Sequence, residues 1–557
     1  MHALTAPLSE LAEIEEICEE RGREPGMLLL SGCVTSQKTH LMYALGKDYG
    51  HTLIVLSSED KAKKLYEEYR FLNENTSYYP AKDLLFYQAD IHGKQLVKQR
   101  METLQMMMEA KSQVTVITTI DGFMDELPSE AEIKGDILTI SNGEALEFES
   151  LKEKIIKLGY DREAQVDGPG QFAVRGGIID IYPLTEELPI RIEFWGDEVD
   201  SIRTFDVDSQ RSVENLEQIV IYPADDRLGS DRKVSFINYF DPKDTLVFLD
   251  EPARLLEKGR LAENEVEKAR ENRAEEMERT GEMEEAPEFF TTDEIIKFLN
   301  KFCMIGMCAL EMKCKPFFVK KRFGIQAKSV NPYNSSFEML TQDLKRLKRN
   351  GYRAVLISGS RTRAKRLAED LRDYDLSSFY SEDQEREVNP GEIMVCYGHI
   401  EVGYEYPMIK FIVISESDIF GKTKKKKKRK SYDGQKISSF SDLKPGDYVV
   451  HENHGLGIYR GIEKIEVDKV TKDYMKISYA DGGNLYILAT QLDQIQKYAS
   501  ADAKKPKLNK LGGQEWHRTK SKVKTAVWQI AKDLVELYAV RQSCLLYTSP
   551  SPRDMRR

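Results

Sequence analysis

The sequence lacks several features that would assign it to a familiar class of protein. No apolar run approaches the roughly 20 residues that a membrane-spanning helix needs. The N-terminus has no basic segment followed by an apolar one, so it does not resemble a secretory signal. The chain holds only 7 cysteines, an odd and scattered set that does not form a disulfide framework. We therefore expect a cytoplasmic protein with no membrane contact.

Metal-ligand spacing is missing as well. Cys303, Cys308 and Cys314 cluster, but no second group of cysteines or histidines completes a zinc pattern, so we expect buried apolar thiols and no metal site. The net charge of −11 argues against an overall electrostatic attraction to nucleic acid, although it leaves room for a local basic patch.

Patterns that are present predict several α/β units. A length of 557 residues suggests roughly three to four domains, and 41% hydrophobic with 31% charged residues is a globular composition. Strand and helix patterns alternate at Thr52–Ser57, Glu59–Leu72, Lys94–Ala110 and Val114–Thr119. This alternation predicts a parallel sheet with helices on both faces, and Gly351–Gly421 repeats it.

A short apolar run near the N-terminus leads into SGCVTSQKT, which nearly matches the phosphate-loop pattern GxxxxGK[ST]. Gly32, Lys38 and Thr39 stand at their places in the pattern, but Gln37 replaces the second glycine. That glycine normally lets backbone N–H groups converge on phosphates. We therefore expect that the chain keeps the fold of a phosphate-loop protein but that its degenerate loop does not bind a nucleotide tightly.

A later strand ends in two acids. Leu246–Leu249 followed by Asp250 and Glu251 resembles a Walker B strand, whose carboxylates position magnesium and water in a working site. Because the matching loop is damaged, we favour two solvated acids at a strand end. The alternative is an ATPase that uses Lys38, Thr39 and Asp250, and nucleotide binding by the purified protein would discriminate between them.

Between the two halves of this module, strand alternation at 191–194 and 199–205, with a turn at Gly196, predicts an inserted antiparallel domain. Gly170–Ser212 closely resembles domain 2 of the excision-repair protein UvrB and its counterpart in transcription-repair coupling factors. The resemblance implies that Arg175, Arg191 and Trp195 contact UvrA. Arginine and tryptophan dominate interface hot spots, whereas without the resemblance the two arginines would be interpreted as solvated strand residues.

One departure from UvrB concerns damage verification. Only Ala81–Gly93 separates Tyr79 and Pro80 from the next predicted helix. This is too short for the aromatic hairpin that UvrB inserts between DNA strands, so we expect the nearby tyrosines to pack in the core.

The stretch Pro445–Tyr498 combines short strands with tight turns and has no room for helices. Met475, Ile477 and Tyr479 alternate with polar residues, so one face can be buried. We expect a small, strongly bent β barrel.

This stretch, PGDYVVHENHGLGIYRG followed by YMKISYADGGNLYIL, resembles the RNA-polymerase-interacting domain of bacterial transcription-repair coupling factors, a Tudor-like module shared with CarD regulators. The resemblance implies that the strand Gly461–Val467, with Ile465, Glu466 and Val467, pairs with the polymerase β subunit. An unpaired strand edge suits such pairing. The sequence leaves open whether Ile465 contacts the partner or fills the barrel core.

Basic and terminal segments complete the chain. Eight of the nine residues 422–430 are basic, which predicts a solvated linker. An apolar stripe of helical period follows Leu511 and resembles the relay helix that leads into the family's DNA-translocating motor. The motor motifs are not found, and the last residues resemble the out-of-frame end of a truncated gene.

The expected fold class is α/β multidomain: a UvrB-like parallel module with an inserted antiparallel domain, a second small α/β domain, a CarD/Tudor-like barrel and a C-terminal helix. The expected parts are UvrB-like domain 1a (1–135), the UvrA-binding domain 2 (136–224), UvrB-like domain 1b (225–333), α/β domain 3 (334–420), a basic linker (421–440), the polymerase-interacting domain (441–500), a relay helix (511–541) and a non-native tail (542–557).

The resemblance predicts transcription-coupled nucleotide excision repair, in which a monomer binds the β subunit of a stalled RNA polymerase and recruits UvrA. The family is an ATP-dependent DNA translocase that uses ATP, Mg²⁺ and double-stranded DNA, but we expect no cofactor and no catalytic residue in this chain. The alternatives are a UvrB-like ATPase related to helicases and a CarD-like transcription regulator.

Overall fold

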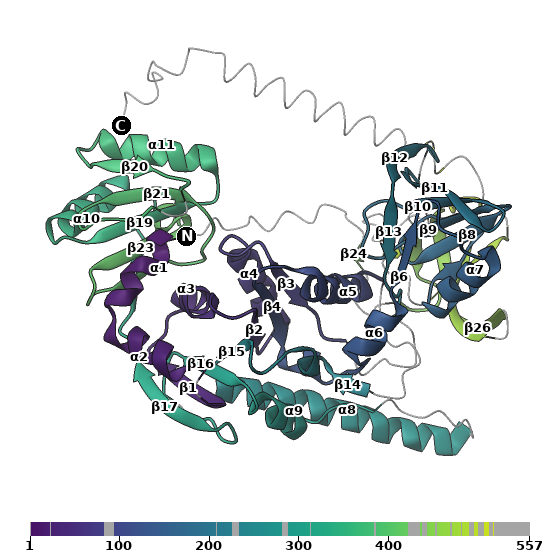
Figure 1. The fold of residues 1–557 in the computed structure, drawn as a ribbon, viewed down its shortest axis with the longest axis horizontal. Helices are drawn as coiled ribbons and strands as arrows, with labels where there is room; N and C mark the ends of the chain where they lie inside the picture. The colour runs from purple at the N-terminus through teal and green to yellow at the C-terminus, as the bar shows by residue number, and fades with distance from the viewer. Residues whose placement is uncertain are drawn as a thin grey trace, which may run out of the picture. The chain divides into compact units, whose positions relative to one another are not determined.

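The computed structural model describes the backbone of most of the chain (Figure 1). The described residues are 2–22, 24–82, 94–207, 209–225, 233–280, 288–311, 313–383, 386–421, 435–436, 443–451, 454–467, 470–480, 482–488, 495–498, 506–511, 516 and 518. The predicted tail at 542–557, nearly all of the relay helix and most of the basic linker lie outside these residues. No helix within the described residues is both long enough and apolar enough to span a bilayer.

The chain divides into two compact units, Met1–Tyr87 with Lys94–Lys428, and Gln88–Gly93 with Arg429–Arg557. The first unit is built on a seven-stranded sheet of order β17-β1-β16-β15-β2-β4-β3, in which every pairing is parallel. Its strands are β1 (Gly26–Ser31), β2 (His51–Leu56), β3 (Thr76–Tyr79), β4 (Val114–Thr119), β15 (Thr245–Asp250), β16 (Cys303–Cys308) and β17 (Val319–Gly324).

Helices cover both faces of this sheet, as the alternation predicts. Leu28 and Leu30 of β1 join one apolar cluster, whereas Met27 and Leu29 join the other, because successive side chains point to opposite faces. The first cluster includes residues of α2 (Ala12–Glu20), α3 (Thr35–Gly46) and α4 (Glu59–Tyr69). The second includes residues of α5 (Lys94–Glu109), α8 (Pro252–Thr280) and α9 (Thr292–Leu299). Tyr78 and Tyr79 are buried, so they pack in the core as expected.

The inserted domain holds a six-stranded sheet of order β12-β11-β10-β9-β8-β7, antiparallel except for the short β7–β8 pair. Its strands are β7 (Asp161–Arg162), β8 (Gln171–Arg175), β9 (Ile178–Tyr182), β10 (Ile190–Trp195), β11 (Glu198–Phe205) and β12 (Ser212–Leu216). Helix α7 (Phe148–Lys157) and the β6–β13 pair (Leu138–Ser141 and Gln218–Ile221) pack on one face.

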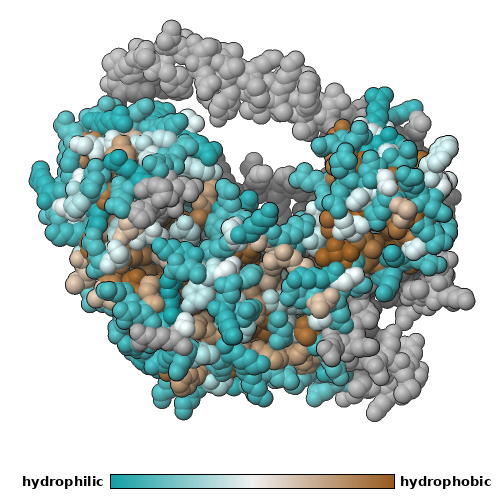
Figure 2. Space-filling view, in the orientation of Figure 1, coloured by the Kyte–Doolittle hydropathy of each residue, from teal (hydrophilic) through white to brown (hydrophobic). Residues whose placement is uncertain are grey.

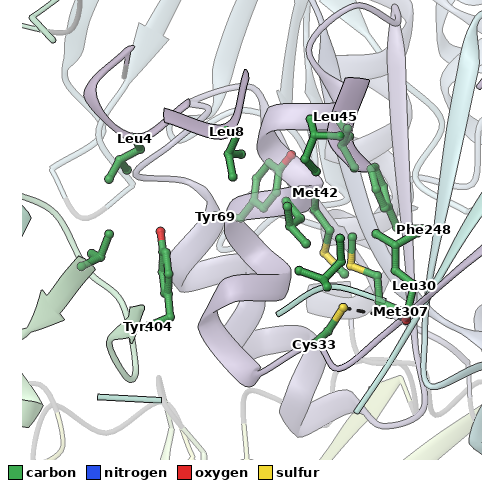
Figure 3. Packing of buried hydrophobic residues seen from close by; sticks show 14 of the residues in the cluster. Leu4, Leu8, Leu30, Cys33, Met42, Leu45, Tyr69, Phe248, Met307 and Tyr404 are labelled. Atoms are coloured by element: carbon green, nitrogen blue, oxygen red, sulfur yellow. Dashed lines mark hydrogen bonds between the residues drawn. The ribbon is translucent and has the colours of Figure 1, made fainter. Parts of the chain in front are cut away.

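A second α/β sheet follows, with order β18-β22-β23-β19-β21-β20. Its strands are β18 (Lys328–Ser329), β19 (Arg353–Ser358), β20 (Ser378–Tyr380), β21 (Ile393–Tyr397), β22 (Tyr404–Tyr406) and β23 (Phe411–Ser415), and its helices are α10 (Phe337–Arg349), α11 (Arg361–Arg372) and α12 (Glu416–Phe420). Its β22 residue Tyr404 shares an apolar cluster with Leu4, Leu8 and Tyr69 of the first module (Figure 3). One continuous core therefore joins the two α/β sheets.

The second unit contains a six-stranded antiparallel sheet of order β24-β29-β25-β26-β27-β28. Its strands are β24 (Gln435–Lys436), β25 (Tyr448–His451), β26 (Gly455–Val467), β27 (Val470–Ser478), β28 (Asn484–Leu488) and β29 (Ile495–Lys497). Met475, Ile477 and Tyr479 are buried, which confirms the predicted apolar face. The mixed α/β multidomain class is confirmed, while closure of this sheet into a barrel stays a prediction.

Candidate functional sites

The loop between β1 and α3 has the sequence outline of a phosphate loop, but other groups of the protein fill the space where a phosphate would bind. Gly32 has a φ of +81°, and a Cβ there would lie 2.5 Å from the backbone oxygen of Ile325. Only glycine fits this position, for a reason internal to the protein. Gln37 is fully buried, and its Oε1 accepts a hydrogen bond from the Val34 N–H at 2.9 Å. A loop amide of the kind that would face a phosphate is thus bound to the side chain that replaced glycine.

Lys38 is held by the two acids that follow β15. Its Nζ lies 2.6 Å from Oδ1 of Asp250 and 2.7 Å from Oε1 of Glu251. Burial alone would lower the pKa of Lys38, but the two carboxylates outweigh that effect and the pKa is raised. The expectation of solvated acids is wrong, since the side chains of Asp250 and Glu251 are only 9% and 12% exposed. They are satisfied by Lys38 and, for Glu251, by the Ala309 N–H at 3.0 Å.

Thr39, whose counterpart in a working loop binds magnesium, is buried beside Glu68. Burial raises the pKa of the Glu68 carboxyl to about 8, and hydrogen bonds from Ser36 and Thr39 oppose that rise only in part. The structure therefore brings Lys38 together with Asp250 and Glu251, whereas the Gln37 side chain is bound to the loop itself and Thr39 faces Glu68.

Helix α3 also packs against the second α/β sheet. The Ser36 hydroxyl accepts a hydrogen bond from the Val402 N–H at 3.1 Å. The Nδ1 of His40 lies 3.2 Å from Oη of Tyr406, and its Nε2 lies 2.6 Å from the backbone oxygen of Leu4. Burial lowers the pKa of His40 to about 4. The helix that would carry a phosphate at its N-terminus thus serves as packing surface between two domains.

A second candidate site lies on the sheet of the inserted domain. Arg175 on β8 and Arg191 on β10 flank Asp180 on β9, which is 1% exposed. Arg191 binds Asp180 through two bonds, Nε–Oδ1 at 2.6 Å and Nη2–Oδ2 at 2.9 Å, and Arg175 Nη2 reaches Oδ2 at 2.6 Å. The hydrogen bond to Asp180 raises the pKa of Arg191. One buried carboxylate therefore orients both guanidinium groups.

Two further residues contact these arginines, and a third, Trp195, lies on the same strand as Arg191. The Arg191 guanidinium carbon lies 4.4 Å from the centre of the Phe205 ring, and Gln210 contacts both arginines. Trp195, at the end of β10, is 83% exposed. The face of the molecule seen in Figure 2 is mostly hydrophilic, with several apolar patches. Asp180 and Gln210 were missed from the sequence. The lone acid within the apolar run Ile178–Ile181 was a usable signal for Asp180, whereas nothing local marks Gln210.

The third candidate site is the long strand β26. Residues Gly461–Val467 pair with β27, with Ile465 opposite Lys472, whereas pairing with β25 involves only the residues from Gly455 to Ile458. Among the described strands none pairs with the other side of Gly461–Val467, so part of its backbone N–H and C=O groups has no strand neighbour. The side chains of Ile465, Glu466 and Val467 lie outside the described part, and their roles stay predictions.

Comparisons with known proteins add a family context to these sites. Residues 138–226 match the family described as the UvrB interaction domain, and residues 443–499 match the CarD-like/TRCF RID domain. The chain is 30% identical to the transcription-repair-coupling factor of Bacillus subtilis (strain 168), over 95% of this chain and 50% of that protein. Those of Staphylococcus haemolyticus (strain JCSC1435) and Staphylococcus epidermidis (strain ATCC 35984) are 29% and 28% identical, over 93% and 97% of this chain and 49% and 51% of theirs. The chain thus spans about half the length of the curated relatives it matches.

Proposed function

We propose that this chain, a homologue of the transcription-repair-coupling factors, corresponds to their N-terminal part and joins a stalled RNA polymerase to the excision-repair protein UvrA in the cytoplasm. The observation that carries the proposal is the presence of both matched domains, at 138–226 and 443–499, on one chain. A CarD-like regulator would not need the first domain. The division into UvrB-like domains 1a, 2 and 1b, domain 3 and a Tudor-like polymerase-binding barrel is part of this proposal.

The polymerase arm of the proposal rests on β26. A strand whose backbone groups lack a neighbour on one side can accept a strand of a partner, with main-chain hydrogen bonds supplying affinity and alternate side chains supplying specificity. The side of Gly461–Val467 away from β27 offers such an edge within the described residues. We propose that the polymerase β subunit pairs there and contacts Ile465, Glu466 and Val467.

The UvrA arm rests on the two arginines and the tryptophan. Arg175 and Arg191 are ordered before binding by Asp180, so less side-chain entropy is lost when a partner binds. Trp195 supplies a large exposed aromatic anchor. We propose that UvrA binds across these three side chains.

We further propose that the degenerate phosphate loop does not bind ATP. The residues present do not fit a nucleotide, since Gln37 caps the loop amide of Val34 and Lys38 is already bound by Asp250 and Glu251. The ATP, Mg²⁺ and double-stranded DNA of the family's translocase activity would then act elsewhere in a full-length protein. The alternative of a UvrB-like ATPase predicts magnesium-dependent nucleotide binding by this chain.

Purified chain, UvrA and polymerase β subunit test the two arms separately. We expect Arg191→Ala to lose UvrA and keep the β subunit, and Ile465→Arg to do the reverse. The exposed Arg366→Ala and Tyr498→Arg serve as matched surface controls, and thermal melts check folding. Unchanged UvrA binding by a folded Arg191→Ala variant would remove the UvrA arm, and unchanged β-subunit binding by Ile465→Arg would remove the proposed edge contact.

A further inference from the structure

Gln210 lies in the loop between β11 and β12, in an unusual backbone conformation. Its φ is +57°, a left-handed value that side-chain-bearing residues rarely adopt. The Gln210 N–H donates to the Asp206 oxygen at 2.8 Å, which ties this turn together. The conformation directs the side chain toward Arg175 and Arg191 on strands β8 and β10.

Both ends of the Gln210 carboxamide are engaged. Its Oε1 accepts from Nη2 of Arg191 at 3.2 Å and lies 3.5 Å from Nη2 of Arg175. Its Nε2 donates to the Val207 oxygen at 2.9 Å, which fixes the orientation of the amide. The side chain is therefore a held acceptor that bridges two guanidinium groups already bound to Asp180.

The charge balance explains why an amide suits this position. Two guanidinium cations and the single carboxylate of Asp180 leave one net positive charge in the cluster. The nearby Glu193 forms an ion pair with Arg203, so this second pair does not change the net charge of the cluster. A second carboxylate at position 210 would cancel the remaining charge and could not donate to the Val207 oxygen, whereas a carboxamide keeps that bond and orients the arginines without cancelling the charge.

We propose that Gln210 is a positioning residue of the partner-binding site, holding Arg175 and Arg191 in a fixed arrangement while preserving one net positive charge for the partner. This inference rests on the proposed binding of UvrA to the same surface. Gln210 acts through the arginines, and its own contact with the partner is not required.

Three substitutions separate orientation from charge. Gln210→Gly removes the carboxamide while fitting the left-handed backbone. Gln210→Asn keeps a carboxamide and also tolerates that backbone. Gln210→Glu keeps the shape and adds one negative charge. Gln218→Glu, at an exposed position on β13 in the same domain, is the matched charge control.

UvrA binding is measured at low and high salt with the whole chain. Loss of order in two arginine side chains predicts a dissociation constant about 3- to 10-fold larger for Gln210→Gly, and the same direction for Gln210→Asn, whose side chain is one methylene too short to keep the contacts with both arginines. For Gln210→Glu we expect a slower association rate at low salt, a difference that shrinks as salt rises, and no such effect in Gln218→Glu.

A second measurement does not depend on UvrA. Nitrogen NMR of the arginine side chains reports rotation of the Arg175 and Arg191 guanidinium groups, and we expect faster rotation in Gln210→Gly than in the wild type. If Arg191→Ala loses UvrA while all Gln210 variants bind and rotate as the wild type does, the role of Gln210 is refuted and the UvrA site stands. If the wild type fails to bind UvrA, the proposed function fails, and unchanged rotation would refute the positioning role as well.

Discussion

Replacing Lys38 by methionine separates an internal ion cluster from a nucleotide-binding loop. In a working phosphate loop the lysine serves the ligand, so its removal abolishes nucleotide binding and leaves the fold intact. In this protein Lys38 serves Asp250 and Glu251. We therefore expect the opposite pattern, a loss of stability with no change in nucleotide binding.

The size of the loss follows from burial. Lys38→Met leaves two carboxylates that are 9% and 12% exposed without their nearest cation. Removing one partner of a buried ion pair costs about 3–5 kcal/mol. Lys61, 3.4 Å from Asp250, remains and compensates in part. The unfolding free energy of the first unit should fall by about 2–4 kcal/mol.

Urea unfolding followed by circular dichroism measures this change. Lys61→Met is the matched control, because Lys61 is 43% exposed and its removal should cost less than about 1 kcal/mol. Asp250→Asn with Glu251→Gln should restore part of the stability of Lys38→Met by removing the stranded charges. Since the pKa of Lys38 is raised, its contribution is complete below its usual value of 10.5 and is lost as the pH rises above it.

Two results would refute this reasoning. A Lys38→Met variant as stable as Lys61→Met would mean that the cluster does not hold the fold. Nucleotide binding by the wild type that disappears in Lys38→Met, measured by calorimetry with ATP and Mg²⁺, would restore the ATPase alternative.

Two further predictions concern other buried polar contacts. Burial lowers the pKa of His40 from 6.5 to about 4, so between these pH values the unfolded chain binds a proton that the folded chain does not. The free energy of unfolding should therefore fall by up to about 3 kcal/mol as the pH drops from 6.5 to 4. Urea midpoints measured at pH 7 and pH 5 should differ less in His40→Gln than in the wild type, and an equal pH dependence in both proteins would contradict this. In the second unit, the Leu456 N–H donates to Asn509 Oδ1 at 2.8 Å, and the Asn509 N–H donates to the Leu456 oxygen at 3.1 Å. Asn509→Ala should cost about 1 kcal/mol by removing the first of these bonds, seen as faster proteolysis near residue 509, while the exposed Lys507→Ala should leave cleavage unchanged.

Features that repeat along the chain could be predicted from the sequence. Alternating strand and helix patterns predicted the parallel sheet, and the period-two pattern at Met475, Ile477 and Tyr479 predicted the buried face of the second unit. The departure of Gln37 from the phosphate-loop pattern was visible in nine residues. Such features are local, since they depend on the period of a helix or strand or on one turn.

Contacts between distant segments were decided by the tertiary structure. Lys38 and Asp250 are separated by 212 positions, and the sequence suggested solvated acids because nothing near them indicates which cation the fold brings close. The Gln210 contact with Arg191 spans 19 positions and depends on a left-handed turn that the sequence does not mark. The spacing of apolar residues and the composition determine which face of a helix or strand is buried. Only packing of the whole chain determines which buried charges meet, because two charges attract each other strongly only after water has been excluded from both.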